Sequence, residues 1–99
     1  MNKIYRALAD PTRRRILELL RQREMSAGEL AEHFDLAKPT LSGHFALLRE
    51  AGLIDAEKRG TTILYRLNLS VLEEALKAFI DSLDLAERLL RPAPQESKT

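Results

Sequence analysis

The sequence predicts a mostly α fold with a two-stranded β-hairpin, with elements in the order ααααββα. Three observations predict it. A Ser-x-x-Glu pattern from Ser26 to Glu29 marks the start of a short helix. From Leu41 onward, apolar residues at i, i+4 and i+7 indicate a second helix. Apolar and polar residues then largely alternate over residues 62–67, as they do in a half-buried strand.

Length and composition limit the class of protein. The chain has 99 residues, which suggests one domain, and we expect it over residues 1–91. It has no cysteine, so disulfides and thiolate metal sites are excluded. No apolar run approaches the roughly 20 residues of a membrane span, and the N-terminus lacks a signal-peptide pattern, so we expect a cytoplasmic protein without a membrane partner. Residues 92–99, PAPQESKT, predict a disordered tail.

The formal net charge of +1 does not itself indicate a nucleic-acid partner. Its distribution is more informative. Residues 1–66 contain 12 Lys and Arg against 9 Asp and Glu, a balance of +3, whereas residues 67–99 contain 4 against 6, a balance of −2. The basic part includes the pair of helices described above, which agrees with a partner of negative charge.

The first two helices are expected over residues 2–9 and from Asp10-Pro11 onward. Asp10 is a favourable N-cap, and proline fits the first helical position. Residues 13–15 are three arginines near the start of the second helix. They are interpreted as a solvated face, or as a surface that contacts a DNA backbone or the acidic C-terminal helix.

Residues 26–52 form the central unit of two short helices and a tight turn. The second helix is expected at about residues 38–51, with Pro39 in its first turn and Gly52 as its C-terminal stop. Its inner face carries large apolar residues, whereas the outer face is small, polar and free of acids. A helix that presses against base edges needs such short side chains. We therefore expect this helix to lie in a DNA major groove.

A basic hairpin follows this unit. Its two strands are expected over residues 53–57 and 62–67, and Gly60 permits a turn with positive φ. Lysine and arginine at a hairpin tip also serve to prevent edge pairing, so an ordinary surface hairpin is the alternative. After a helix-turn-helix, the cations favour a wing over residues 57–62 that contacts DNA. The fold is thus a winged helix-turn-helix.

The last helix is expected to begin after Ser70 as its N-cap and to continue through Leu90. Apolar residues recur along it at heptad spacing, and a second apolar line runs beside them. A monomer of this size cannot cover both lines, so we expect a homodimer through the first and last helices. The predicted interface residues are Ile4, Tyr5, Leu8, Leu72, Leu76, Phe79 and Leu83.

Four segments together resemble a known family. LADPTRRRILELL, ELAEHF, KPTLSGHFALLREAGLI and KRGTTILYRL follow in the order of the ArsR/SmtB-type winged-helix repressors, over about residues 3–76. Within the family the chain looks most similar to the metal-independent, SdpR-like autorepressors. The resemblance implies a homodimer that binds an operator of imperfect two-fold symmetry and represses transcription. It also implies dimerisation through the first and last helices.

The chain departs from the metal-sensing members of this family. Their Cys-x-Cys pair falls on Ser26 and Gly28, and no histidine follows His44. Asp81, Asp84 and Glu87 have a spacing that could hold a hard cation, but salt-paired surface acids are the preferred interpretation. We therefore expect no metal site and no cofactor.

The predicted mode of DNA binding places the second helix in the major groove and the wing at the flanking minor groove. Arg49 is expected at a phosphate, and His44 either at DNA or in a buried hydrogen bond. Gly43 either allows close backbone approach or removes a base contact. The candidate DNA-binding residues are Lys38, Thr40, Ser42, Gly43, His44, Arg49, Lys58 and Arg59.

An enzyme is not expected, because the sequence has no Gly-rich phosphate loop and no plausible nucleophile grouping. Three alternatives remain open. The protein could respond to an unidentified small effector bound between dimer helices, or it could be a winged-helix module that binds another protein. RNA binding is a weaker alternative, because aromatic residues for base stacking are scarce.

Overall fold

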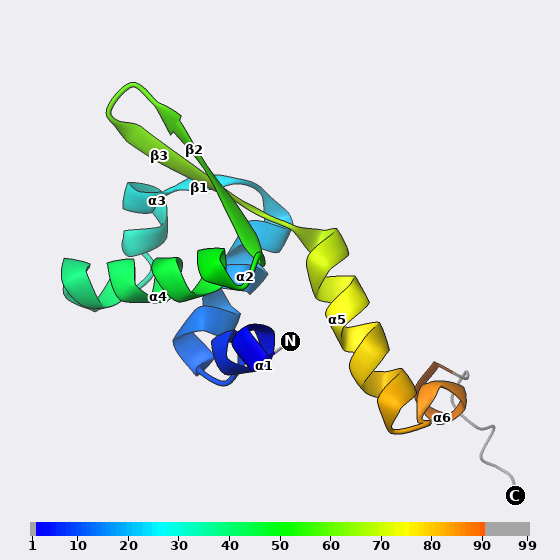
Figure 1. Cartoon of the computed structure of the whole chain (residues 1–99). Helices are drawn as coiled ribbons and strands as arrows, with labels where there is room; N and C mark the ends of the chain where they lie inside the picture. Colours follow the sequence, from blue (N-terminus) through cyan, green and yellow to red (C-terminus); the bar gives the residue numbers. More distant parts are fainter. Residues whose placement is uncertain (1, 91–99) are drawn as a thin grey trace, which may run out of the picture.

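A computed structural model describes residues 2–90, and Figure 1 shows their arrangement. The predicted mostly helical winged fold is confirmed. The wing and the helices before it form the body of the molecule, and the last helices project away from it. The elements are α1 (Asn2–Leu8), α2 (Pro11–Gln22), β1 (Met25–Ser26), α3 (Ala27–Ala31), α4 (Lys38–Glu50), β2 (Ile54–Arg59), β3 (Thr62–Leu67), α5 (Leu69–Ser82) and α6 (Ala86–Leu90). The tail predicted over 92–99 lies outside the described residues.

The sheet has three strands, not the two predicted. Its order is β1-β3-β2, and β1 pairs antiparallel with β3 through Met25 opposite Tyr65 and Ser26 opposite Leu64. Two residues are too few to show the alternation that identifies a strand in a sequence. Met25 is nevertheless only 4% exposed, so β1 also contributes to the core.

The core lies between α2, α3, α4 and the base of the wing. Its completely buried side chains include Ile16, Leu30, Leu48 and Leu53. The rings of Phe45 and Tyr65 pack with centroids 4.7 Å apart, which ties α4 to the wing. Burial of large apolar side chains of this kind stabilises a domain by about 1.5–3 kcal/mol each. Helix α4 and the wing therefore form one packed unit.

The predicted ends of the two central helices are largely confirmed. Ser26 Oγ accepts the amide of Glu29 at 3.0 Å, and Glu29 Oε1 accepts the amide of Ser26 at 2.8 Å, which completes the capping box. Gly52 has φ of 77° and ends α4. The first of these helices, α3, is short and ends at Ala31, because the amides of His33 and Phe34 bond three residues back in tighter turns.

The C-terminal helix differs from the prediction at both ends. Asn68, not Ser70, is the N-cap, and its side chain accepts the amide of Val71 at 3.4 Å. The helix is also broken. Asp84 has φ of +57°, and the amide of Leu85 bonds back to the carbonyl of Ile80, which closes α5 before α6 begins. Aspartate tolerates this left-handed conformation better than most residues. The sequence therefore shows no glycine or proline at the break, and the heptad spacing of apolar residues continues on both sides of Asp84.

None of the helices in residues 2–90 is long and apolar enough to cross a membrane.

Candidate nucleic-acid interface

Helix α4 separates its side chains as the sequence predicts. Leu41, Phe45 and Leu48 are buried, at 3%, 5% and 0% exposure. The residues predicted to face DNA at its N-terminal half, Lys38, Thr40, Ser42 and Gly43, are all exposed. This outer face carries no acid before Glu50, so it can approach a polyanion without charge repulsion.

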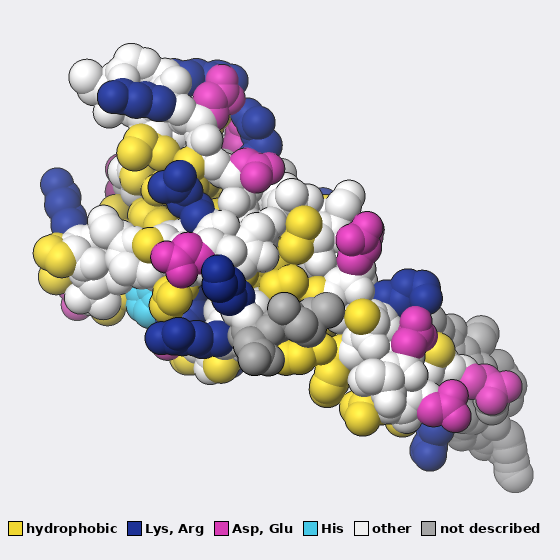
Figure 2. Space-filling view, viewed as in Figure 1, with side chains coloured by type: hydrophobic (Ala, Val, Ile, Leu, Met, Phe, Trp, Pro, Cys, Tyr) yellow, Lys and Arg dark blue, Asp and Glu magenta, His cyan; other side chains and the backbone are white. Residues whose placement is uncertain are grey.

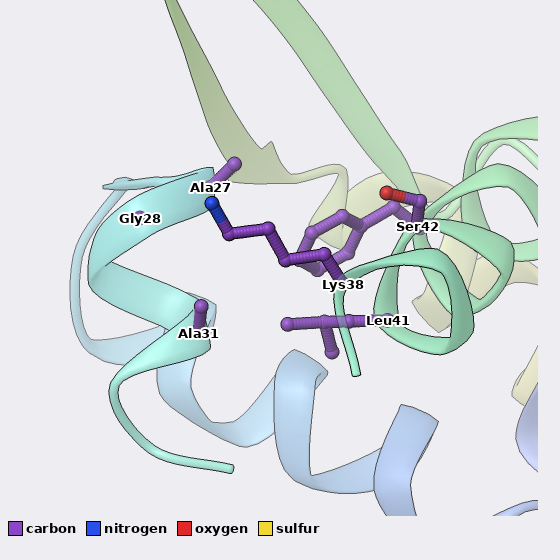
Figure 3. A pocket seen from close by; sticks show the side chains of 7 residues that line it. Ala27, Gly28, Ala31, Lys38, Leu41 and Ser42 are labelled. Carbon is purple, nitrogen blue, oxygen red and sulfur yellow. The ribbon is translucent and has the colours of Figure 1, made fainter. Parts of the chain in front are cut away.

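A pocket of about 230 Å³ lies between α3 and α4 (Figure 3). Small side chains of α3, Ala27 and Ala31 with Gly28, form one side, and Leu41, Ser42 and Phe45 of α4 form the other. The Lys38 side chain extends across the mouth of this pocket, with its ammonium group toward α3. The small side chains of α3 therefore leave space for the Lys38 ammonium group at the surface between α3 and α4.

Gly43 has no packing reason to be glycine. A Cβ built at this position would have no other atom within 4 Å. It lies inside a 13-residue helix, where glycine costs about 0.8–1.0 kcal/mol relative to alanine. Packing inside the protein therefore does not require glycine at this position.

His44 faces inward, unlike Ser42 and Gly43 before it. Its side chain is only 15% exposed, and Nδ1 lies 3.1 Å from Nη1 of Arg13 and 3.9 Å from Asp10 Oδ2. Of the two roles predicted for His44, this geometry favours the buried hydrogen bond. The amide of Arg13 donates to the carboxylate of Asp10, which is the main cause that lowers the pKa of that carboxyl.

The three arginines of α2 act differently from each other, and the sequence did not indicate how. Arg13 and Arg14 donate to the last carbonyls of α1, whereas Arg15 forms an exposed ion pair with Glu18 at 3.1 Å. The signal that could have found this was the short connection between α1 and α2, which places the first turn of α2 beside the end of α1.

The wing carries its cations where the sequence predicts them. Lys58 and Arg59 are exposed, and Gly60 at the tip has φ of +63°. Arg49, in the last turn of α4, is also exposed, and its charge opposes the rise that burial causes in the pKa of Tyr65. In Figure 1 the wing tip and the N-terminal end of α4 both lie on the side away from α5.

Glu57 is a functional candidate that the sequence reasoning missed. Its carboxylate holds Arg59 at 3.2 Å and Arg66 at 2.7 Å, and Arg66 also reaches Glu24 at 3.3 Å. Hydrogen bonds from Arg59 and then Arg66 lower the pKa of Glu57. Because side chains two apart in a strand share a face, the pairing of Glu57 with Arg59 was readable from the sequence. The wing arginine is therefore held by an acid.

The free cations differ from Arg59 in this respect. Among the described residues, neither Lys38 nor Lys58 has a carboxylate partner within 4.0 Å. These ammonium groups can meet a phosphate without first breaking an ion pair.

The residues predicted for the dimer interface fall into two groups in the structure. Ile4, Leu8 and Leu72 are partly buried against the protein's own core. Tyr5, Leu76, Phe79 and Leu83 remain exposed, at 39%, 43%, 45% and 52%. The rings of Tyr5 and Phe79 lie edge to face with centroids 5.5 Å apart, so α1 and α5 share this surface. Figure 2 shows hydrophobic side chains at the surface along α5.

Within residues 2–90, no three His, Asp or Glu side chains come together as a group that could hold a metal ion. The Ser26 hydroxyl is used in the capping box, and Gly28 has no side chain that could bind a metal ion. The acids Asp81, Asp84 and Glu87 are separated by the break between α5 and α6, and Asp81 pairs with Lys77 at 2.8 Å.

Comparison of this chain with known proteins identifies its relatives. A model of the "Bacterial regulatory protein, arsR family" matches residues 10–56, from the cap of α2 to the first strand of the wing. The transcriptional repressor SdpR of Bacillus subtilis (strain 168) is 43% identical over 76 residues, which are 77% of this chain and 84% of that protein. The arsenical resistance operon repressor of Staphylococcus xylosus is 38% identical over 74% of this chain and 70% of that protein.

Solved structures agree with these matches. A crystal structure described as an ArsR family transcriptional regulator superposes with a TM-score of 0.78 and 31% identity, over 87% of this chain and 94% of that one. HlyU from Vibrio cholerae N16961 superposes with a TM-score of 0.65 and 35% identity, over 88% of this chain and 87% of that one.

Proposed function

Because the chain belongs to the ArsR family of bacterial regulatory proteins, whose members matched here are transcriptional regulators and not enzymes, we propose that it is a repressor that binds a specific DNA operator as a homodimer. The operator is an imperfect palindrome, and each half-site receives one α4 in the major groove and one wing at the flanking minor groove. The protein is expected to act in the cytoplasm.

The observation that carries this proposal is the outer face of α4. It combines a free cation, Lys38, with the short side chains of Thr40, Ser42 and Gly43, and it has no acid before Glu50. Short donors and methyl groups fit against base edges, while the lysine and the wing cations suit phosphates. Arg49, in the last turn of α4, and Lys58, on the wing, add further exposed cations.

The apolar surface of α1 and α5 supports the dimer. Four large apolar side chains stay between 39% and 52% exposed in the single chain, although the rest of the core is closed. Exposed apolar residues that are contiguous on one helix face usually mark an interface. A second copy brings the same face, so the two surfaces match each other around a two-fold axis.

DNA binding is tested by fluorescence anisotropy with DNA from upstream of the protein's own gene, beside scrambled DNA, across a salt series. We expect preference for the first DNA and a steep negative slope of log affinity against log salt. Lys38→Ala removes two cations per dimer, so the slope becomes shallower by about 1.8, at about 0.9 for each lost phosphate contact. Lys77→Ala, on α5, is the matched control and keeps the wild-type slope.

Equal and weak binding to both DNAs would place the operator elsewhere or require an effector. A complete lack of binding at low salt would refute the proposal and favour the protein-binding module. The dimer is tested separately by sedimentation: Phe79→Asp should give monomers, whereas Ala78→Asp, exposed but outside the apolar line, should leave dimers. Dimers that survive Phe79→Asp and Leu76→Asp would refute the proposed interface.

A further inference from the structure

One guanidinium group joins three helices behind the DNA-facing surface. Arg13, in the first turn of α2, donates through Nε to the carbonyl of Ala7 at 2.8 Å and through Nη2 to the carbonyl of Arg6 at 2.9 Å. Its Nη1 lies 3.1 Å from Nδ1 of His44 on α4. The same residue therefore holds the C-terminal end of α1 and the middle of the recognition helix.

The donor and the acceptor of the hydrogen bond between Arg13 and His44 are fixed by the chemistry of arginine. Arginine stays protonated and can only donate, so Nδ1 of His44 must be the acceptor. The imidazole is then neutral, with its proton on Nε2. Replacing the ring by a side chain without an acceptor leaves an arginine donor unpaired in a partly buried place, and an unpaired buried donor is costly.

The contact continues to the surface proposed for the dimer. Helix α1, whose last carbonyls Arg13 holds, also carries Tyr5, and the Tyr5 ring packs against Phe79 of α5 with centroids 5.5 Å apart. The N-terminal end of α4 has no side-chain hydrogen bond to hold it, because Ala37 is its N-cap residue. The orientation of α4 therefore depends on its packing against the body, in which the Arg13–His44 contact is the polar component linking it to α1.

We propose that Arg13 and His44 are positioning residues that set the orientation of α4 relative to the α1–α5 surface, and that His44 acts through Arg13 rather than by touching DNA. This inference rests on the proposed function. Its support is geometric: His44 is 15% exposed and turned toward α1 and α2, whereas the residues before it on α4, Ser42 and Gly43, are exposed. Chains of packed side chains and hydrogen bonds of this kind can carry energetic coupling between two sites.

The test uses two variants of equal shape. His44→Asn keeps an acceptor, because asparagine Oδ1 stands two bonds from Cβ, as His Nδ1 does; His44→Leu has the same size without an acceptor. We expect His44→Leu to bind the operator about tenfold more weakly, within the range of 0.5–2 kcal/mol (about 2- to 30-fold) for mutations that alter coupling. His44→Asn should stay within about threefold of wild type, and dimerisation and non-specific DNA binding should not change.

A double-mutant cycle completes the test. Arg13→Gln also removes the hydrogen bonds to the carbonyls of Arg6 and Ala7, so it should weaken operator binding at least as much as His44→Leu does. Adding His44→Leu to Arg13→Gln should cause no further loss, because the contact between the two side chains is already gone. Additive losses, or a loss only in the His44 variants, would overturn the proposal and assign His44 a direct DNA contact. Equal losses for His44→Asn and His44→Leu would overturn it as well.

Nitrogen NMR of the imidazole in the DNA-free protein separates this inference from the proposed function. We expect a neutral His44 ring with the proton on Nε2, and a changed Nδ1 signal in Arg13→Gln. A ring protonated at Nδ1 at neutral pH would overturn the contact itself. If the wild type binds no operator, the proposed function and the positioning role both fail, while the expected ring signals would still establish the Arg13–His44 bond.

Discussion

Replacing Gly43 by alanine should make the protein more stable and a poorer DNA binder. An alanine Cβ at this position meets no atom within 4 Å, so the change has no steric cost inside the protein. The helix gains about 0.8–1.0 kcal/mol per protomer from propensity alone. With a urea m-value of about 1–3 kcal/mol/M, the unfolding midpoint rises by about 0.3–1 M.

The measurement is urea unfolding followed by circular dichroism, at one fixed protein concentration because dimerisation adds to apparent stability. Ala46→Gly, exposed on the same helix, is the control and should lower the midpoint by a similar amount. Operator affinity is measured on the same samples, and we expect Gly43→Ala to weaken it by about tenfold, which corresponds to about 1.4 kcal/mol. A lower unfolding midpoint would refute the helix argument, and unchanged affinity would refute close approach of DNA to Gly43.

Three further predictions test other parts of the structure. Gly52→Ala forces an L side chain into φ of 77° and should lower the free energy of unfolding by about 1–2 kcal/mol in urea titrations, opposite in sign to the change at Gly43; an increase would contradict the turn. Glu57→Gln releases Arg59 from its ion pair and removes one negative charge from each wing. Anisotropy titrations should therefore show tighter DNA binding at low salt. Weaker binding would instead show that Glu57 orients the arginine for DNA. The hydrogen bond from the Ser26 amide is the main cause that lowers the pKa of Glu29 in the folded protein below the ordinary value of 4.5. This hydrogen bond therefore stabilises the protein fully above pH 4.5, and the stabilisation is lost as the pH falls through the lower pKa of the folded state. Glu29→Gln keeps an acceptor and should remove that part of the acid dependence in thermal melts at a series of pH values, whereas an unchanged profile would contradict it.

The two central helices could be predicted from the sequence because their signals are local. The capping box at Ser26, the inward spacing of Leu41, Phe45 and Leu48, and the stop at Gly52 each depend on residues within one or two turns. Such short-range signals survive without knowledge of the rest of the fold. The candidate DNA-binding residues on α4 other than His44 are exposed, and their positions follow from the same periodicity.

The third strand and the broken last helix could not be predicted for different reasons. Strand β1 exists only because β3 offers it an edge, and that pairing joins residues about 40 positions apart. The break at Asp84 is local, but the apolar spacing continues across it, and the aspartate resembles an ordinary surface acid. Periodicity records which side of a chain is apolar, and it does not record whether the backbone stays helical.

The ion pairs of the wing show a second limit of sequence reasoning. A count of cations at residues 58 and 59 treats them alike, yet Arg59 is held by Glu57 while Lys58 has no carboxylate within 4.0 Å among the described residues. Both glutamate partners of Arg66 lie far from it in the chain or across the hairpin. The pair of Glu57 and Arg59 lies within β2 and follows from the spacing of two residues, whereas the pairing of Arg66 across strands is revealed only by the fold.

The separation of the two candidate surfaces gives the proposed dimer its geometry. The exposed apolar residues lie on α1 and α5, whereas the wing and the N-terminal end of α4 point away from α5. A two-fold axis through the α5 surfaces would therefore put both recognition helices on the outer parts of the dimer, where each can enter its own half-site. Half-sites read by such a dimer are spaced by about one helical turn, 34–36 Å. Inserting five base pairs between the half-sites would turn one of them to the opposite face of the duplex, and inserting ten would keep the face but double the spacing. Both insertions should therefore prevent one dimer from binding two half-sites, and full affinity after either insertion would contradict this geometry.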